Sequence, residues 1–374
     1  MKRSTSLALA LPAAWLALSI GSLACQKETP ATSPPTAAQT PAPGQAAGPT
    51  SPAAAERINP RVLRRFQPVD GAVETRPSPQ KVALGRMLFF DKRLSRGHDI
   101  ACNSCHDLAK FGADGKPTSP GSGGGLGTRN SPTVFNAATH IAQFWDGRAA
   151  DVETQATGPI LNPREMAMPD EKAVVAVLST IPAYLRLFDR AFPDEKPSLT
   201  LAHVGIAIGS FVRGLVTTSR WDKFIAGDSA ALTAEETYGL HVFVDTGCMT
   251  CHTGPQVGGT MFQRVGALLP WPNQKDRGRI EVTKAPADEM VFKVPTLKNV
   301  AETGPYFHDG SVADLETAIK MMGRHQLGIE LETREVKAIA AWLRSMTGKI
   351  DPVYAEAPTL PEGGPSTARA SPRL

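Results

Sequence analysis

The chain has 374 residues, of which 41% are apolar and 20% charged, a composition typical of a globular protein long enough for two ordinary domains. Its formal net charge is +4, and loss of Lys2 and Arg3 with a leader would lower it to +2. So small a charge argues against nucleic acid as a partner and against electrostatic attachment to an anionic membrane.

A secretory leader is predicted at residues 1–24. Lys2 and Arg3 give it a positive start, and residues 7–23 form an uncharged run of apolar and small residues. Small residues and a cysteine close the run, which indicates a cleaved signal rather than a spanning helix. Cys25 then resembles a lipoprotein cleavage position, although the residue three before it is usually larger. We expect a periplasmic protein held to a bacterial membrane only by a lipid on Cys25; the alternative is ordinary cleavage and a soluble periplasmic protein.

Two segments of biased composition flank the folded region. Residues 25–58 are rich in Pro, Ala, Thr, Gln, Gly and Ser, and they carry too few large apolar residues to pay for folding. We expect a disordered linker there and a disordered tail of similar composition at 355–374. Between them we place two domains, at 59–226 and 227–354.

Helix signals dominate these two domains. Ser78 followed by Pro79 predicts a helix start, and Thr233 with Glu236 forms a capping box at the start of another. Apolar residues recur with a 3.6-residue period over 201–215 and 336–346. Few runs alternate with period two, so the sequence predicts a mainly α fold with long loops and little β-structure.

One motif with chemical meaning occurs twice, 146 residues apart, and no other fixed-spacing repeat was recognised. The copies are Cys102-Asn103-Ser104-Cys105-His106 and Cys248-Met249-Thr250-Cys251-His252. Two cysteines three apart can each bond one vinyl group of a porphyrin, and the adjacent histidine then reaches the iron. A zinc site would require four ligands in close sets, and a redox dithiol has no use for the histidine. The motifs therefore predict two c-type haems in two cytochrome c-like domains, with His106 and His252 as proximal iron ligands.

Met322 is the predicted sixth ligand of the second iron. Leu315, Ala318 and Ile319 precede Met322 by seven, four and three residues, so their side chains lie on the same helical face as that of Met322. The Met321 side chain lies on a different face. A thioether ligand raises the haem potential. A core-filling role for Met322 and ligation by His325 are the alternatives.

Several longer segments resemble a known family. They are LGRMLFFDKRLS (84–95), RNSPTVFN (129–136), AQFWDGRA (142–149), QATGP (155–159), FKVPTLKNV (292–300), GPYFHDGS (304–311) and MGRHQLG (322–328). With both haem motifs, their order and spacing resemble bacterial di-haem cytochrome c peroxidases and the related methylamine-utilisation di-haem enzymes. The resemblance implies a peroxide site at the first haem and a high-potential electron relay at the second. Met322 falls at the relay methionine, where methylamine-type enzymes carry tyrosine.

The resemblance also implies roles for residues that residue-level reasoning would not single out. Glu165 matches the acid–base carboxylate at the peroxide site, Gln155 a pocket glutamine that positions peroxide or water, and Trp145 the tryptophan between the haems. Asn130, Thr303 and Pro305 match a Ca²⁺ site built from one side chain and two backbone carbonyls. The implied partners are hydrogen peroxide and a small cytochrome c or cupredoxin that donates electrons, and members of the family often form homodimers.

The chain departs from the family at one position. Many of these peroxidases carry a histidine that caps the resting peroxidatic iron, and Ser122 stands at that position here. Since serine is a poor ferric-haem ligand, we expect the first haem to keep an open face in every redox state, unless His98 or His140 substitutes. Oxidation of a partner protein, as in the methylamine-type enzymes, and non-catalytic electron transfer are the alternative functions.

Overall fold

The computed structural model describes residues 58–67 and 77–367. The predicted leader, Cys25 and all but the last residue of the predicted linker lie outside these ranges. Within them, no helix is long and apolar enough to cross a bilayer.

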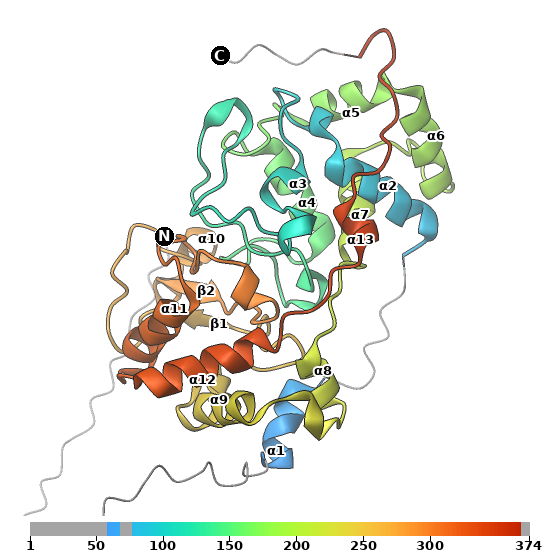
Figure 1. Cartoon of the computed structure of the whole chain (residues 1–374). Helices are drawn as coiled ribbons and strands as arrows, with labels where there is room; N and C mark the ends of the chain where they lie inside the picture. Colours follow the sequence, from blue (N-terminus) through green and yellow to red (C-terminus); the bar gives the residue numbers. More distant parts are fainter. Residues whose placement is uncertain (1–57, 68–76, 368–374) are drawn as a thin grey trace, which may run out of the picture. The chain divides into compact units, whose positions relative to one another are not determined.

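The described chain is mainly helical (Figure 1), which confirms the predicted fold class. The α-helices are α1 Pro60–Leu63, α2 Pro79–Phe90, α3 Cys102–Cys105, α4 Val152–Leu161, α5 Glu171–Ser179, α6 Pro182–Ala191, α7 Leu201–Val212, α8 Arg220–Ile225, α9 Ala234–Asp245, α10 Ile280–Thr283, α11 Leu315–Met321, α12 Thr333–Arg344 and α13 Pro352–Ala355. Strands β1 (Phe262–Arg264) and β2 (Val291–Lys293) pair antiparallel, with Gln263 opposite Phe292. The remaining turns of helix are short 3-10 segments and one π-helix, Met322–Leu327.

The predicted helix starts are confirmed. The Ser78 side chain accepts a hydrogen bond from the backbone N of Lys81, with Pro79 in the first turn of α2. At α9, Thr233 caps the N of Glu236, and the Glu236 carboxylate accepts in return from the N of Thr233 at 2.8 Å. Each cap satisfies backbone donors that the helix itself leaves unpaired.

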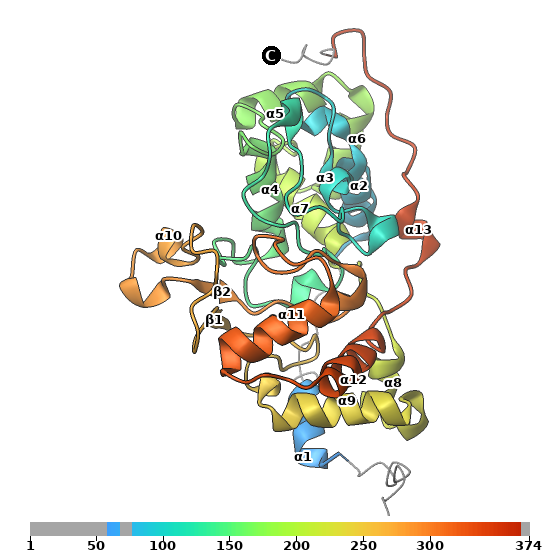
Figure 2. The same cartoon turned by 60° about the vertical axis from the view of Figure 1, so that its left-hand side comes forward.

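Each half of the molecule is built on one closely packed pair of helices. In the first half α2 packs against α7, and in the second α9 packs against α12, as Figures 1 and 2 both show. A glycine lies at each crossing: a Cβ built on Gly85 would overlap the carbonyl of Ala207, and one on Gly239 would overlap that of Ala338. The two halves therefore share one helix-packing solution, with each haem motif following the first helix of its pair.

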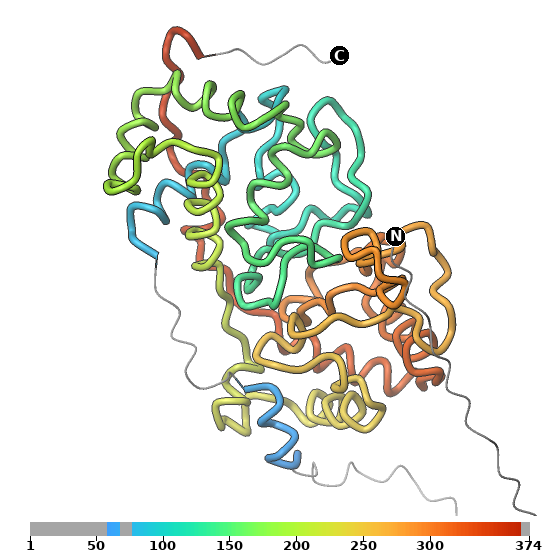
Figure 3. The backbone as a smooth tube through the Cα atoms, turned by 180° about the vertical axis from the view of Figure 1, so that it is seen from behind, coloured from blue at the N-terminus to red at the C-terminus, as the bar shows by residue number. Residues whose placement is uncertain are grey.

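The packing of the chain ends differs from the predicted domain boundaries. Ile58 and Phe66 belong to the hydrophobic cluster of the second half, which is built mainly on α9 and α12. Tyr354, near the C-terminal end of the described chain, packs instead against the hydrophobic cluster of the first half. The segment then runs along that half (Figure 3), where Pro361 O accepts a hydrogen bond from Arg93 at 2.8 Å. The described part of the predicted tail, up to residue 367, is thus tied to the first half, because its backbone carbonyls meet arginine donors there.

A second internal repeat, which the sequence analysis missed, becomes evident in the structure. Residues 131–147 (SPTVFNAATHIAQFWDG) and 294–310 (VPTLKNVAETGPYFHDG) match at a constant offset of 163. Their backbones agree as well: Asn136 and Asn299 have φ of 62° and 60°, and Phe144 and Phe307 have φ of 64° and 70°. Antiparallel bridges close both loops six residues apart, Gln143 with Ala149 and Tyr306 with Val312.

The helix crossing in the second half gives a direct stability test. Gly239→Ala forces a methyl group against the Ala338 carbonyl, and we expect a loss of about 1–3 kcal/mol in the free energy of unfolding. Gly125→Ala is the matched control, because a Cβ there meets nothing within 4 Å and the backbone φ is negative; its effect should stay within about 0.5 kcal/mol. Equal unfolding free energies for the two variants, from denaturant titration of the haem-loaded protein, would contradict the close crossing.

Candidate haem centres and peroxide site

The first haem motif is a single helical turn. In α3 the Ser104 hydroxyl accepts from the N of Ala101 at 3.0 Å, and the N of His106 donates to Cys102 O at 2.9 Å. The Nδ1 atom of His106 lies 3.4 Å from Gly112 O, which leaves Nε2 as the ring nitrogen available to a metal. Burial lowers the pKa of His106, so the imidazole is neutral, as an iron ligand must be.

The second motif has the same local design. The N of His252 donates to Cys248 O at 3.1 Å, and burial lowers the pKa of His252 to about 4. Thr296 donates its hydroxyl to Gln256 O at 2.9 Å and so ties the following loop to the second copy of the repeat. In the first half Thr133, its counterpart, donates to Phe111 O at 2.6 Å.

The four motif cysteines fit covalent haem attachment better than either alternative. Burial raises the pKa of Cys102 to about 12 and raises the pKa of Cys105, Cys248 and Cys251 as well. Reactive redox dithiols have a lowered pKa instead. Among residues 58–67 and 77–367 no three His, Cys, Asp or Glu side chains are grouped as a metal site, so the thiols also lack zinc-type co-ligands.

Glu165 and Gln155 are both positioned by α4. Gln155 lies half-buried within the helix, and Glu165 follows in the turn after it, where Asn162 donates its amide to the Glu165 carboxylate at 2.9 Å. Burial raises the pKa of Glu165, against the opposing charge of Arg148. Burial is the main cause of the raised pKa of Cys102 and Cys105, and the negative charge of Glu165 is a smaller cause that raises both pKa values further. The Glu165 carboxylate therefore lies near the first haem motif.

The glycine-rich loop that contains Ser122 is fixed against the Glu165 turn. The N of Ser122 donates to Glu165 O at 2.7 Å, and its hydroxyl donates to Asp99 Oδ1 at 2.8 Å while accepting from the N of Gly97 at 3.0 Å. A Cβ on Gly121 would overlap Arg164 O, so only glycine permits this approach. The Ser122 hydroxyl is therefore engaged within the protein and does not act as a free ligand.

Trp145 lies where the two copies of the repeat, residues 131–147 and 294–310, meet. The N of Asn130 donates to His308 O at 2.8 Å, and the N of Lys293 donates to Trp145 O at 2.7 Å. Positions 130 and 293 immediately precede the two copies at the same offset of 163, and positions 145 and 308 are equivalent within them. The contact is therefore reciprocal, like an interface between two identical subunits. The Trp145 and His308 rings face each other edge-on, with centroids 6.4 Å apart. Trp145 thus occupies the junction between the two haem-binding halves.

Met322 lies at the change from the α-helix α11 to the π-helix. It is partly buried and packs, with Met321 and Trp145, against a small cluster of Trp271, Met290 and Phe292. Ala318 and Ile319, which the sequence places on its face, are buried. His325, the rival ligand, has Nδ1 2.9 Å from Pro270 O. The α-helical phase therefore holds as far as Met322 and not beyond it, because the backbone switches to π-helical bonding there.

Among the residues predicted to bind calcium, Asn130 has hydrogen bonds that bear on the site. The Asn130 amide nitrogen donates to Lys116 O at 3.0 Å, which orients the side chain and leaves its carbonyl oxygen as an acceptor. The bond from Asn130 N to His308 O brings this residue near the segment that contains Thr303 and Pro305. The calcium site itself stays a prediction.

Sequence reasoning gave no role at the junction to three residues found there, His308, Lys293 and His140; it considered His140 only as a substitute iron ligand. His308 is 2% exposed and stacks on Phe292 with ring centroids 4.1 Å apart. Lys293 lies in β2 with its Nζ 3.2 Å from Nδ1 of His140. The repeated FWDG and FHDG sequences were the available signal, since they mark His308 as the partner of Trp145.

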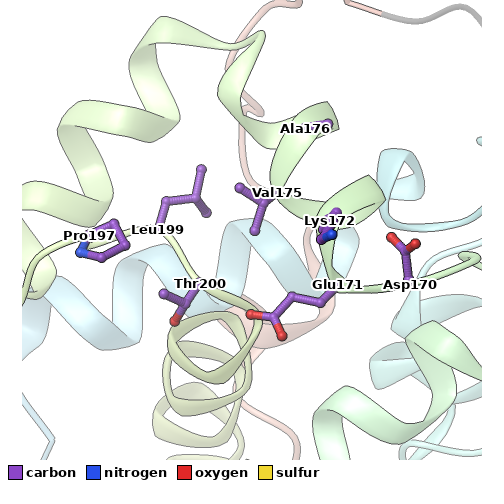
Figure 4. A pocket seen from close by; sticks show the side chains of 8 residues that line it. All are labelled: Asp170, Glu171, Lys172, Val175, Ala176, Pro197, Leu199 and Thr200. Atoms are coloured by element: carbon purple, nitrogen blue, oxygen red, sulfur yellow. The ribbon is translucent and has the colours of Figure 1, made fainter.

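A surface pocket lies away from all of these residues. Figure 4 shows it between the start of α5 and the segment before α7, lined by Asp170, Glu171, Lys172, Val175, Ala176, Pro197, Leu199 and Thr200. No predicted haem, peroxide or relay residue lines it.

Known proteins resemble the chain along most of its length. Residues 79–230 match the family model for di-haem cytochrome c peroxidases. The chain is 42% identical over 314 residues to a cytochrome c551 peroxidase of Nitrosomonas europaea, covering 83% of this chain and 92% of that protein. A cytochrome c551 peroxidase of Pseudomonas aeruginosa is 42% identical over 327 residues, covering 85% and 93%.

More distant relatives extend the same pattern. The methylamine utilization protein MauG of Methylorubrum extorquens is 33% identical over 296 residues, covering 76% of this chain and 82% of that protein. Among solved structures, a MauG-like protein associated with microbial copper homeostasis matches with a TM-score of 0.67 and 28% identity, covering 79% of this chain and 97% of that one. Two CXXCH motifs, a half-buried carboxylate beside the first and these relatives agree, and the chain belongs to the di-haem cytochrome c peroxidase family.

Proposed function

We propose that the enzyme reduces hydrogen peroxide to two waters at the first haem, using two protons and two electrons that arrive singly through the second haem. The haems supply the redox chemistry. The observation that carries the proposal is the half-buried Glu165 carboxylate, held by Asn162 beside the first haem motif, with its pKa raised by partial burial. A carboxylate with a raised pKa is suited to exchanging a proton near neutral pH.

Glu165 acts as the acid–base group in this proposal. It takes a proton from the peroxide oxygen nearer the iron and returns it to the far oxygen, so that water can leave as the O–O bond breaks. Gln155, on the preceding helix α4, orients peroxide or water. The Asn162 amide keeps the carboxylate in one position, which is how a proton-transfer group contributes most.

An open face on the first iron is the second part of the proposal. Ser122 stands at the position of the capping histidine, and its hydroxyl is engaged by Asp99 and Gly97. His140, one possible substitute, faces Lys293 in the junction. With no protein group capping it, the first haem would be accessible to peroxide without prior reduction of the second.

Met322 and Trp145 form the relay side of the proposal. Met322 would hold the iron of the second haem through its thioether, which would raise the potential of that haem, and Trp145 lies between it and the first half. Methionine in place of the tyrosine of methylamine-type enzymes favours peroxide, rather than a partner protein, as substrate. We further propose Ca²⁺ at Asn130, Thr303 and Pro305, a small cytochrome c or cupredoxin as electron donor, and a periplasmic location with a lipid on Cys25.

Glu165→Gln tests the proposal most simply. The amide cannot accept the proton, so kcat for peroxide should fall by about 10²–10⁴-fold. In the parent, kcat/KM should fall as the pH drops through the raised pKa of Glu165, at a higher pH than an ordinary glutamate would give, and this limb should vanish in the variant. Glu330→Gln, an exposed glutamate, is the control. Full turnover in Glu165→Gln would rule out the proposed role.

Met322→Leu tests the relay. Loss of the thioether should open the sixth position of the second iron and lower its midpoint potential, read from the absorption spectrum during a redox titration. Met321→Leu removes a neighbouring sulfur that packs against the same cluster and should leave spectrum and potential unchanged. The reverse outcome, a change only in Met321→Leu, would reassign the ligand.

A further inference from the structure

Lys293 is a buried lysine without a carboxylate partner among residues 58–67 and 77–367. It is 8% exposed, and its one described side-chain contact is Nδ1 of His140 at 3.2 Å. The comparably buried Lys298, 5% exposed, instead forms an ion pair with Asp222. An unpaired ammonium in such surroundings is costly, so buried lysines normally have a counter-charge.

His140 extends the same polar site. Its Nε2 atom is buried and finds no hydrogen-bond partner in the described part of the chain. Burial lowers the pKa of His140, with the charge of Lys293 adding to the effect, and burial lowers the pKa of Lys293 to about 8. An ammonium group and an unsatisfied imidazole nitrogen, side by side, are suited to bind one anionic carboxylate.

The surroundings of this pair connect it to the second haem. The His140 ring lies against Gly259, seven residues after His252, and the N of Ile141 donates to Gly259 O at 2.9 Å. The N of Gly259 in turn donates to Val294 O, next to Lys293, at 2.8 Å. The pair is therefore built onto the loop that leaves the second haem motif.

We propose that Lys293 and His140 form a carboxylate site whose occupant is a propionate of the second haem. The assignment rests on attachment of that haem at Cys248, Cys251 and His252, and it does not depend on which substrate the enzyme reduces. Lys293 then has two effects. Its charge compensates the propionate and favours the reduced iron, and its backbone N binds Trp145 O at the junction.

Lys293→Met in the haem-loaded protein tests the proposal, with the midpoint potential of each haem followed separately. We expect the equilibrium constant for reduction of the second haem to fall about 10-fold, which is about 59 mV for one electron, and the first haem to change less. Lys293→Arg should retain most of the parent potential. Lys320→Met, which removes one exposed charge from the same half, should have no effect. The propionate bending bands in the resonance Raman spectrum of the second haem should shift in Lys293→Met alone.

Three outcomes would overturn the site. Unchanged potential and propionate bands in a folded Lys293→Met variant would show that the ammonium does not meet this carboxylate. A larger potential shift at the first haem than at the second would show that the carboxylate belongs to the first haem and not to the second. A midpoint in the parent that follows chloride or phosphate concentration, and loses that dependence in Lys293→Met, would identify a free anion as the occupant. Peroxide turnover measured in parallel separates this test from the proposed function, because inactive protein with the expected shifts would leave the site intact.

Discussion

The structure depends on a reciprocal pair of backbone hydrogen bonds between the two haem-binding halves, from Asn130 to His308 and from Lys293 to Trp145. The pair fixes the two copies of one loop face to face, as a two-fold interface would. Behind it, Asn136 and Asn299 both bind the hydroxyl of Thr217, each at 3.0 Å, in the buried connection between the halves. Buried amides satisfied in this way hold a single arrangement, because a shift of either loop would leave polar groups unpaired. The distance between the two redox centres is thereby set by main-chain geometry.

The same loop carries different side chains in the two halves, and that difference separates their roles. Trp145 in one copy corresponds to His308 in the other, and Asn130 corresponds to Lys293. Around the first haem motif the protein provides a half-buried, oriented carboxylate and a loop whose Ser122 hydroxyl is already hydrogen-bonded. Around the second it provides a methionine-containing apolar cluster and a buried cation. In the proposed function, one duplicated scaffold therefore holds one centre for chemistry and one for electron storage.

The sequence was sufficient wherever a signal is local. The caps at Ser78 and Thr233 and the helices α7 and α12 depend on residues within one or two turns, and all lie where they are predicted. The packing of Ile58 and Tyr354, each against the half more distant in sequence, has no local signal. The Lys293–His140 contact joins residues 153 positions apart and has no local signature. The repeat of residues 131–147 at 294–310 can be recognised in the sequence. That its two copies pair with each other is seen only in the folded chain.

In the proposed function the first iron keeps an open face while the second is closed by methionine sulfur. An electron paramagnetic resonance spectrum of the fully oxidised protein tests it most directly, because spin state reports the sixth ligand of each haem separately. We expect one high-spin signal from the first haem and one low-spin signal from the second before any reductant is added. Two low-spin signals, with no high-spin component, would contradict it.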